Sequence, residues 1–79
     1  MALTAAIATI VAAYDRDGVS DEYGFTGPGD CVAHARDVLT LPGTRAIGGY
    51  PIDTDDPDAW AYIAVVSASD AEIAAALSR

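Results

Sequence analysis

Apolar side chains in the first part of the chain recur every three or four residues. This is the spacing of one face of an α-helix, and the positions that carry it are Leu3, Ala6, Ile7, Ile10, Val11 and Tyr14. The other side of the segment carries the small residues Thr4, Ala5, Thr9 and Ala12, which let another element or another molecule approach closely. The pattern predicts a helix over residues 3–14 with one face in the core.

A second helical pattern covers residues 31–41. Its apolar positions again share one face and are Cys31, Val32, Ala35, Val38 and Leu39. Asp30 precedes the pattern and is a suitable N-cap, because its carboxylate can accept a hydrogen bond from a free amide of the first turn. Pro42 and Gly43 follow and do not continue a helix. The sequence therefore predicts a helix that starts after Asp30 and stops before Pro42.

Three segments are interpreted as strands. Residues 60–67 are the clearest, because they are aromatic, β-branched and apolar on both faces, which is typical of a central strand. Residues 22–26 fit a short or bulged edge strand, since Tyr23 and Phe25 alternate around Gly24. Residues 44–50 form a third candidate, weakened at its end by two glycines. Residues 51–58 are expected to form a turn or a long connection.

The last helix is predicted to begin at a capping box. Ser69 and Glu72 have the spacing at which each side chain bonds to the other residue's backbone amide. The core face of this helix is Ile73, Ala76 and Leu77. The whole order predicts a single α+β domain over residues 1–79, in which a small antiparallel sheet of two or three strands packs against two or three helices. The strand order stays open.

Negative charge is concentrated in two segments. The chain has twelve acidic residues, four arginines and no lysine, with a net charge of −8. The first segment contains Asp15, Asp17, Asp21 and Glu22, and the second contains Asp53, Asp55, Asp56 and Asp58. Arg16 is the one basic residue among them. Such a surface repels nucleic acid and acidic membranes and attracts basic protein grooves, so neither nucleic acid nor membrane is expected to bind directly.

The spacing of the second segment suggests how a basic groove would accept it. If residues 53–56 are extended, Asp53 and Asp55 point to the same side, about 6.5–7 Å apart. That distance is about two phosphate steps of roughly 3.4 Å along one DNA strand. Tyr23, beside the first acidic segment, is a candidate contact residue, because tyrosine is common at interfaces. Tyr50 is open between packing and recognition, and Trp60 is expected in the sheet core. A GC-rich genome or a salt-loving host would produce the same composition without any partner.

The sequence contains no catalytic signature that withstands inspection. Cys31 and His34 have the spacing of a nucleophile and a base, but Asp30 opposes a thiolate and the chain has no second histidine, asparagine or glutamine to orient the base. We expect a buried cysteine and a surface histidine. The glycines of residues 24–29 lack the P-loop lysine. No enzyme activity and no cofactor are predicted.

Metal binding is a weaker alternative. EF-hand loops that start at Asp15 or Asp53 lack the oxygen ligand and the glycine required at their fifth and sixth positions. Calcium sites of other kinds stay open, but no metal site is predicted. One cysteine forms no internal disulfide, and the apolar run of residues 2–13 lacks a basic flank and is shorter than the roughly 20 residues of a membrane span. A soluble, cytoplasmic protein is expected.

The two acidic segments, residues 15–22 and 53–58, together with the small size of the chain, resemble the acidic single-domain inhibitors of phages and other mobile elements. These include anti-CRISPR and anti-restriction proteins that imitate DNA. The resemblance implies a non-enzymatic inhibitor that blocks DNA access to a nucleic-acid-binding protein, such as a CRISPR effector complex. The predicted partner-binding residues are Asp15, Asp17, Asp21, Glu22, Tyr23, Asp53, Asp55, Asp56 and Asp58. The alternative is a small structural or oligomerising component of a larger assembly, and a homo-oligomer fits either hypothesis.

Overall fold

The longest helix, α1, is the element against which most of the chain packs. The computed structural model describes residues 2–78 and contains, over that range, five helices and one two-stranded sheet. In chain order these are α1 (Leu3–Arg16), α2 (Val19–Tyr23), α3 (Pro28–Val38), β1 (Leu39–Thr40), β2 (Tyr50–Pro51), α4 (Ala59–Ser67) and α5 (Asp70–Leu77). The first predicted helix is therefore confirmed and runs two residues further than expected.

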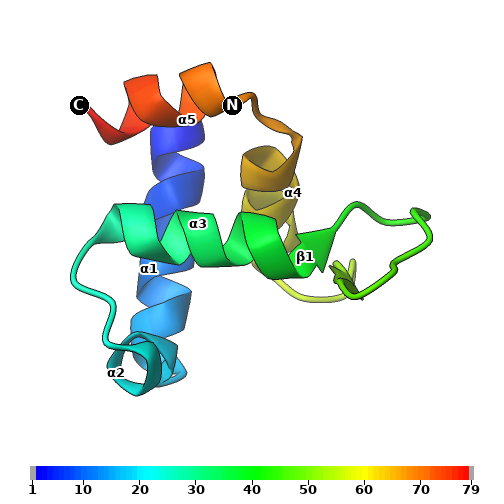
Figure 1. Cartoon of the computed structure of the whole chain (residues 1–79), viewed down its shortest axis with the longest axis horizontal. Coiled ribbons are helices and arrows are strands. Elements are labelled where there is room, and N and C mark those ends of the chain that lie inside the picture. Colours follow the sequence, from blue (N-terminus) through cyan, green and yellow to red (C-terminus); the bar gives the residue numbers. More distant parts are fainter. Residues whose placement is uncertain (1, 79) are drawn as a thin grey trace.

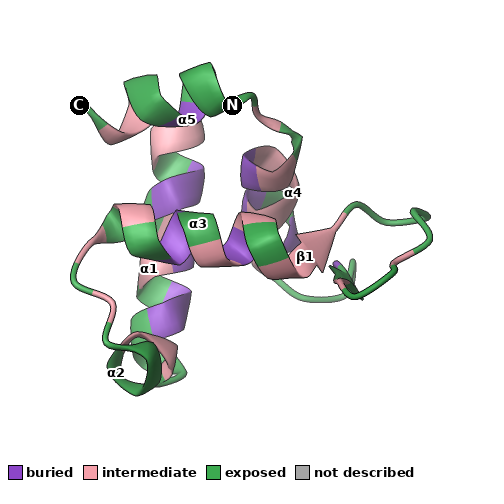
Figure 2. Cartoon of the chain, viewed as in Figure 1, coloured by how far each residue is buried: buried purple, intermediate pink, exposed green. Residues whose placement is uncertain are grey.

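The core lies where α1, α3 and α4 meet. In Figure 1, α3 crosses α1, α4 runs beside α1 in the opposite direction, and α5 lies across the N-terminal end of α1. The largest fully buried side chains, Ile10, Val32 and Val65, come one from each of these three helices. Figure 2 shows that buried positions gather on the helix faces that turn toward one another. Each such side chain contributes about 1.5–3 kcal/mol by leaving water, so this three-helix contact is the main source of stability.

The predicted central strand at residues 60–67 is wrong, because this segment is the helix α4. Its apolar residues occupy all sides, so hydrophobic period alone does not separate a buried helix from a buried strand. A central strand needs neighbours to pair its amides and carbonyls, whereas a helix satisfies them internally. Trp60, expected in a sheet core, is 38% exposed instead. Ala61 and Val65 are the α4 residues that are completely covered.

The predicted edge strand at residues 22–26 is also wrong. Residues 19–23 form the short helix α2, and Gly24 follows it with a left-handed φ of 71°. The second predicted helix is shifted toward the N-terminus, since α3 begins at Pro28 rather than after Asp30. Proline fits the first turn of a helix because its missing amide would have no partner there. Asp30 still bonds at this end, where its Oδ2 accepts from the Thr26 amide at 3.0 Å.

The sheet is much smaller than predicted and has the opposite sense. β1 and β2 are two residues long and parallel, with Leu39 opposite Tyr50 and Thr40 opposite Pro51. Residues 41–49 form a projecting loop between them, where a strand over residues 44–50 was expected (Figure 1). The loop returns tightly, because a Cβ on Gly49 would lie 2.9 Å from Thr40 Cγ2. The α+β class holds in this coarse form, but the antiparallel sheet does not.

The capping box of α5 is confirmed. Ser69 Oγ accepts from the Glu72 amide at 3.2 Å, and Glu72 Oε1 accepts from the Ser69 amide at 3.0 Å. The hydrogen bond from the Ser69 amide, followed by that of the Ser69 side chain, lowers the pKa of Glu72 below its ordinary value. Within residues 2–78, no single helix has the length and apolar character to cross a membrane, and α4 and α5 meet that test only as a pair bent by 117°.

Candidate functional site

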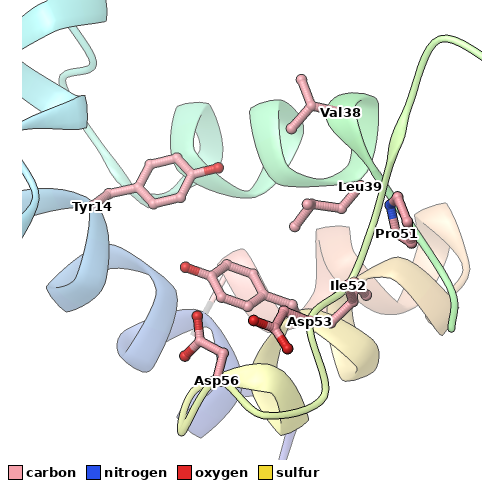
Figure 3. Close-up of a pocket in the computed structure, with 8 residues that line it drawn as sticks. Tyr14, Val38, Leu39, Pro51, Ile52, Asp53 and Asp56 are labelled. Carbon is pink, nitrogen blue, oxygen red and sulfur yellow. The ribbon is translucent and has the colours of Figure 1, made fainter.

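A pocket of about 280 Å³ opens near the N-terminal end of α4. α1, the end of α3, both strands, the segment before α4 and α4 itself each contribute to it. Its lining residues are Tyr14, Val38, Leu39, Pro51, Ile52, Asp53, Asp56 and Tyr62. In Figure 3 the apolar side chains of Val38 and Leu39 lie on one side of the space and the carboxylates of Asp53 and Asp56 on the other. The pocket is therefore apolar on one wall and anionic on the opposite wall.

Tyr14 forms the α1 side of the pocket. It is only 7% exposed, and its hydroxyl shares a hydrogen bond of 2.8 Å with His34 Nδ1. Burial, with smaller electrostatic contributions from Tyr62, Cys31 and Tyr23, raises the pKa of Tyr14 to about 12. The hydroxyl therefore stays neutral at physiological pH.

His34 is not the free surface residue that the sequence suggested. Its ring centroid lies 5.5 Å from those of Tyr14 and Phe25 and 4.9 Å from that of Tyr23. Tyr23 is 59% exposed and stacks on Phe25 at 5.5 Å. The histidine thus belongs to an aromatic cluster beside the pocket, with Tyr23 as its outer layer.

Tyr62 of α4 is the second tyrosine of the pocket, and it lies close to both acidic segments. Burial is the main cause that raises its pKa, followed by the charges of Asp56, Asp58 and Asp17. Its hydroxyl has no hydrogen-bond partner within residues 2–78. The phenol therefore remains protonated and available beside several carboxylates.

Arg16, the last residue of α1, connects the two acidic segments. Its Nε lies 3.2 Å from Asp17 Oδ1, and its Nη2 lies 3.4 Å from Asp58 Oδ2. The hydrogen bond and charge of Asp17, and then those of Asp58, raise the pKa of Arg16. This contact is possible because α4 runs opposite to α1, so the end of one helix meets the start of the other (Figure 1). Segments more than forty positions apart in the sequence meet here.

The second acidic segment is folded into turns rather than extended. Asp53 Oδ1 accepts from the Asp55 amide at 2.9 Å, and Asp56 Oδ1 accepts from the Asp58 amide at 2.8 Å. The expected spacing of Asp53 and Asp55 along an extended chain is therefore wrong. The carboxylates of Asp53 and Asp56 each accept a hydrogen bond from the backbone amide two residues later, which is a turn geometry. In both aspartates Oδ2 has no hydrogen-bond partner among the described residues. Asp56 and Asp58 also lie at the N-terminus of α4, where the helix dipole favours negative charge.

The predicted partner-binding residues divide into three places. Asp17, Asp53, Asp55, Asp56 and Asp58 lie around the pocket or in its adjoining turn, and we call these five residues the acidic rim. Asp21, Glu22 and Tyr23 lie exposed on α2. Asp15 lines a different groove, with Val11 of α1 and Pro28 of α3. The structure therefore brings together five of the nine and leaves the others outside.

Sequence reasoning missed Tyr14, Tyr62 and Arg16 as parts of the site. Tyr62 was hidden by the strand assignment, because four residues span about 13 Å along a strand but only about 6 Å along a helix, so Asp58 and Tyr62 become neighbours only in the helix. Tyr14 ends the apolar stripe of the first helix, and its neighbour Arg16 is the one cation between the acids. That position of Arg16 was the available signal.

The alternative chemistries gain no support from the geometry. Cys31 is buried as expected, at 2% exposure, and its Sγ lies 3.7 Å from Ser20 Oγ. His34 Nδ1 is bonded to Tyr14 rather than directed at a thiol. Among residues 2–78, no three histidine, cysteine, aspartate or glutamate side chains are placed to hold a metal ion.

Comparison of the chain with models of known protein families, with curated proteins and with solved structures finds no match.

Proposed function

We propose that this protein is a non-enzymatic inhibitor that binds a basic nucleic-acid-binding protein, such as a CRISPR effector complex, and blocks DNA access to it. The observation that carries the proposal is the convergence of Asp17 and the second acidic segment on Arg16 and Tyr62. Five aspartates of the acidic rim stand there against one arginine. The excess of negative charge is available to a cationic partner.

The form of the rim supports protein binding rather than catalysis. Its carboxylates are mostly exposed, and two of them are held in place by turn hydrogen bonds, so their positions are fixed before a partner arrives. Preorganised groups lose less conformational entropy on binding. The net charge of −8 further accelerates encounter with a cationic surface. Binding of this kind weakens as salt increases.

A structural or oligomerising component is the second candidate, and a separate groove favours it. This groove, of about 490 Å³, lies between α1 and α5. Its walls are mainly apolar and small, with Ile7, Ala8 and Ala12 on one side and Ala76 and Leu77 on the other. Ile47, which is 90% exposed in the loop of residues 41–49, is a separate apolar side chain available for contact. In this hypothesis binding depends on apolar area and not on the acidic rim.

Capture of partners from the native host, read by mass spectrometry, tests the two candidates. The bait is compared with a rim variant, Asp53→Asn, Asp55→Asn, Asp56→Asn and Asp58→Asn. Asparagine retains the oxygen that accepts the turn hydrogen bonds, so the fold of the segment is preserved. The matched control, Asp15→Asn, Asp21→Asn, Glu22→Gln and Asp37→Asn, removes the same number of charges elsewhere.

The inhibitor proposal expects capture of a basic nucleic-acid-binding protein that loses its DNA when this protein is added. The rim variant should bind it roughly 100-fold more weakly, since several charge-assisted contacts are lost together, whereas the control should change affinity by only about threefold. If the bait and the rim variant both capture only further copies of this chain, and equally well, the inhibitor proposal is contradicted and the oligomerising component is supported.

A further inference from the structure

The pocket inside the acidic rim has the size and chemistry to hold one cationic side chain. We propose that it receives an arginine side chain of the basic partner. The inference rests on the proposed function and specifies how the partner is recognised.

The volume argues for a single side chain. Small-molecule sites usually measure about 300–1,000 Å³, and this pocket, at about 280 Å³, is no larger than the smallest of them. A loop or a helix of a partner would not enter it, but one long side chain would. The rest of the partner would then contact the rim around the opening.

The charge of the lining argues for a cation. Asp53 and Asp56 line the pocket, and Arg16 is engaged with Asp17 and Asp58 rather than with either of them. Each lining carboxylate uses one oxygen in a turn and has its Oδ2 without a partner among residues 2–78. An anionic ligand would be repelled, and a neutral one would leave these oxygens unused.

The two tyrosines and the apolar wall favour arginine over lysine. A guanidinium is planar, stacks on aromatic rings and binds carboxylates through parallel hydrogen bonds, and it is less strongly hydrated than an ammonium. Tyr14 and Tyr62 supply aromatic surface, and the Tyr62 hydroxyl has no other partner in the described chain. The aliphatic part of an arginine would pack on Leu39 and Ile52, as such stems do on apolar surface.

Titration with capped tripeptides, followed by amide NMR shifts, tests the pocket directly. The probes are N-acetyl-Gly-Arg-Gly-amide and its lysine analogue at equal ionic strength. We expect saturable shifts around β2 and the start of α4, with the arginine peptide bound about three to ten times more tightly. Two variants with equal loss of charge follow: Asp53→Asn/Asp56→Asn in the pocket, and Asp15→Asn/Asp21→Asn outside it.

The pocket variant should weaken arginine-peptide binding about tenfold and remove the preference over lysine, while the outside variant should stay within about twofold. Equal binding of the two peptides, shifts confined to α2, or no saturation would overturn the proposal. A second copy could also supply the cation through the exposed Arg45. In that case the protein would self-associate and the associated copies would not bind the arginine peptide. If Arg45→Gln abolishes the association and restores peptide binding, the occupant is a second copy and the partner-arginine proposal fails.

Failure of the pocket and failure of the proposed function give different results. If the peptides do not bind but the rim variant still loses its captured partner, recognition occurs at the rim alone and only the pocket proposal is wrong. If the arginine peptide binds selectively but no basic nucleic-acid-binding protein is captured, the proposed inhibitor function is wrong. The proposed identity of the partner is then wrong as well.

Discussion

The two ends of α4 are each held by an arginine, and the two arginines are used differently. At the C-terminal end, Arg36 Nη1 donates to the carbonyls of Val65 and Ala68, at 3.2 and 2.9 Å, and its Nη2 donates to Asp70 Oδ1 at 2.7 Å. At the N-terminal end, Arg16 pairs with Asp17 at 3.2 Å and with Asp58 at 3.4 Å, and the side chains of these aspartates are 57% and 20% exposed. The Arg36 side chain is 24% exposed and that of Arg16 is 66% exposed.

This difference separates a structural contact from a surface available for binding. Arg36 satisfies carbonyls that the end of a helix leaves without partners, and it ties α4 to the start of α5. One arginine meets one carboxylate there, so the end is balanced. Arg16 meets a surplus of carboxylates in water, where ion pairs contribute little to stability. Charge that does little for folding is the charge expected to serve recognition.

The largest effect is expected from Arg36→Met, which keeps an apolar stem but removes three hydrogen bonds. Two helix-end carbonyls lose their partner, so the free energy of unfolding should fall by about 2–3 kcal/mol. For a chain of this size the melting temperature should fall by roughly 10–20 °C, measured by circular dichroism.

The matched control for Arg36 is Arg45→Met. Arg45 is exposed in the loop of residues 41–49 and has no ion pair among the described residues. Its replacement should change stability by no more than about 0.5 kcal/mol. Equal effects of the two variants would show that Arg36 does not stabilise this end of α4.

An intermediate effect is expected from Gly49→Ala, which probes the wall of the pocket near the N-terminal end of α4. The new Cβ would lie 2.9 Å from Thr40 Cγ2 and 3.4 Å from the Val38 carbonyl oxygen, so β1 and β2 would have to separate. We expect a loss of about 1–2 kcal/mol in urea unfolding.

Gly29→Ala serves as the comparison for Gly49. Gly29 lies in the first turn of α3, and a new Cβ there would lie 3.9 Å from Leu77 Cδ1, an ordinary contact distance. Alanine there should stabilise the protein by up to about 1 kcal/mol, because glycine loses more backbone entropy on folding. A neutral result for Gly49→Ala would mean that the two strands are not in close contact.

The smallest effect is expected from Arg16→Gln. The Arg16 side chain is 66% exposed, so water screens its ion pairs and the melting temperature should stay close to that of the unaltered protein. Any small difference should vanish in about 1 M salt, where charges are screened beyond roughly 3 Å. A fall as large as that of Arg36→Met would show that both ends of α4 are structural, and the distinction between them would be lost.

The sequence predicted those elements whose signals are local. The stripe from Leu3 to Tyr14 and the Ser69–Glu72 capping box each specify a helix by themselves, and both are present. Residues 60–67 could not be assigned in this way, because an apolar run without polar positions has no period to read. Tertiary packing against α1 stabilises this segment as a helix. Likewise, the β1–β2 pairing depends on a close approach at Gly49 that no propensity reveals.

The site was predictable in composition but not in arrangement. The excess of aspartate identified residues that now form the acidic rim. The separation of Asp15 from Asp17 depends on where each lies at the C-terminal end of α1, and that end lies beyond the predicted boundary at residue 14. Asp55 and Asp58 were placed in a turn by Asp53 and Asp56. The pocket itself requires α4 as a helix, so the wrong strand assignment concealed it.

The burial of Cys31 makes the rate at which its thiol is modified a measure of local motion. Its thiol is the only one in the chain and lies at the contact between α3 and the start of α2, next to Ser20. Because Cys31 is 2% exposed, a thiol reagent reaches it when the surrounding segment of residues 20–28 opens or when the whole molecule unfolds. The rate of modification under native conditions, set against the rate of global unfolding, therefore gives the free energy of that local opening. Because this segment also contains Tyr23 and Phe25, which contact His34, the same measurement follows how often the aromatic cluster becomes accessible to water.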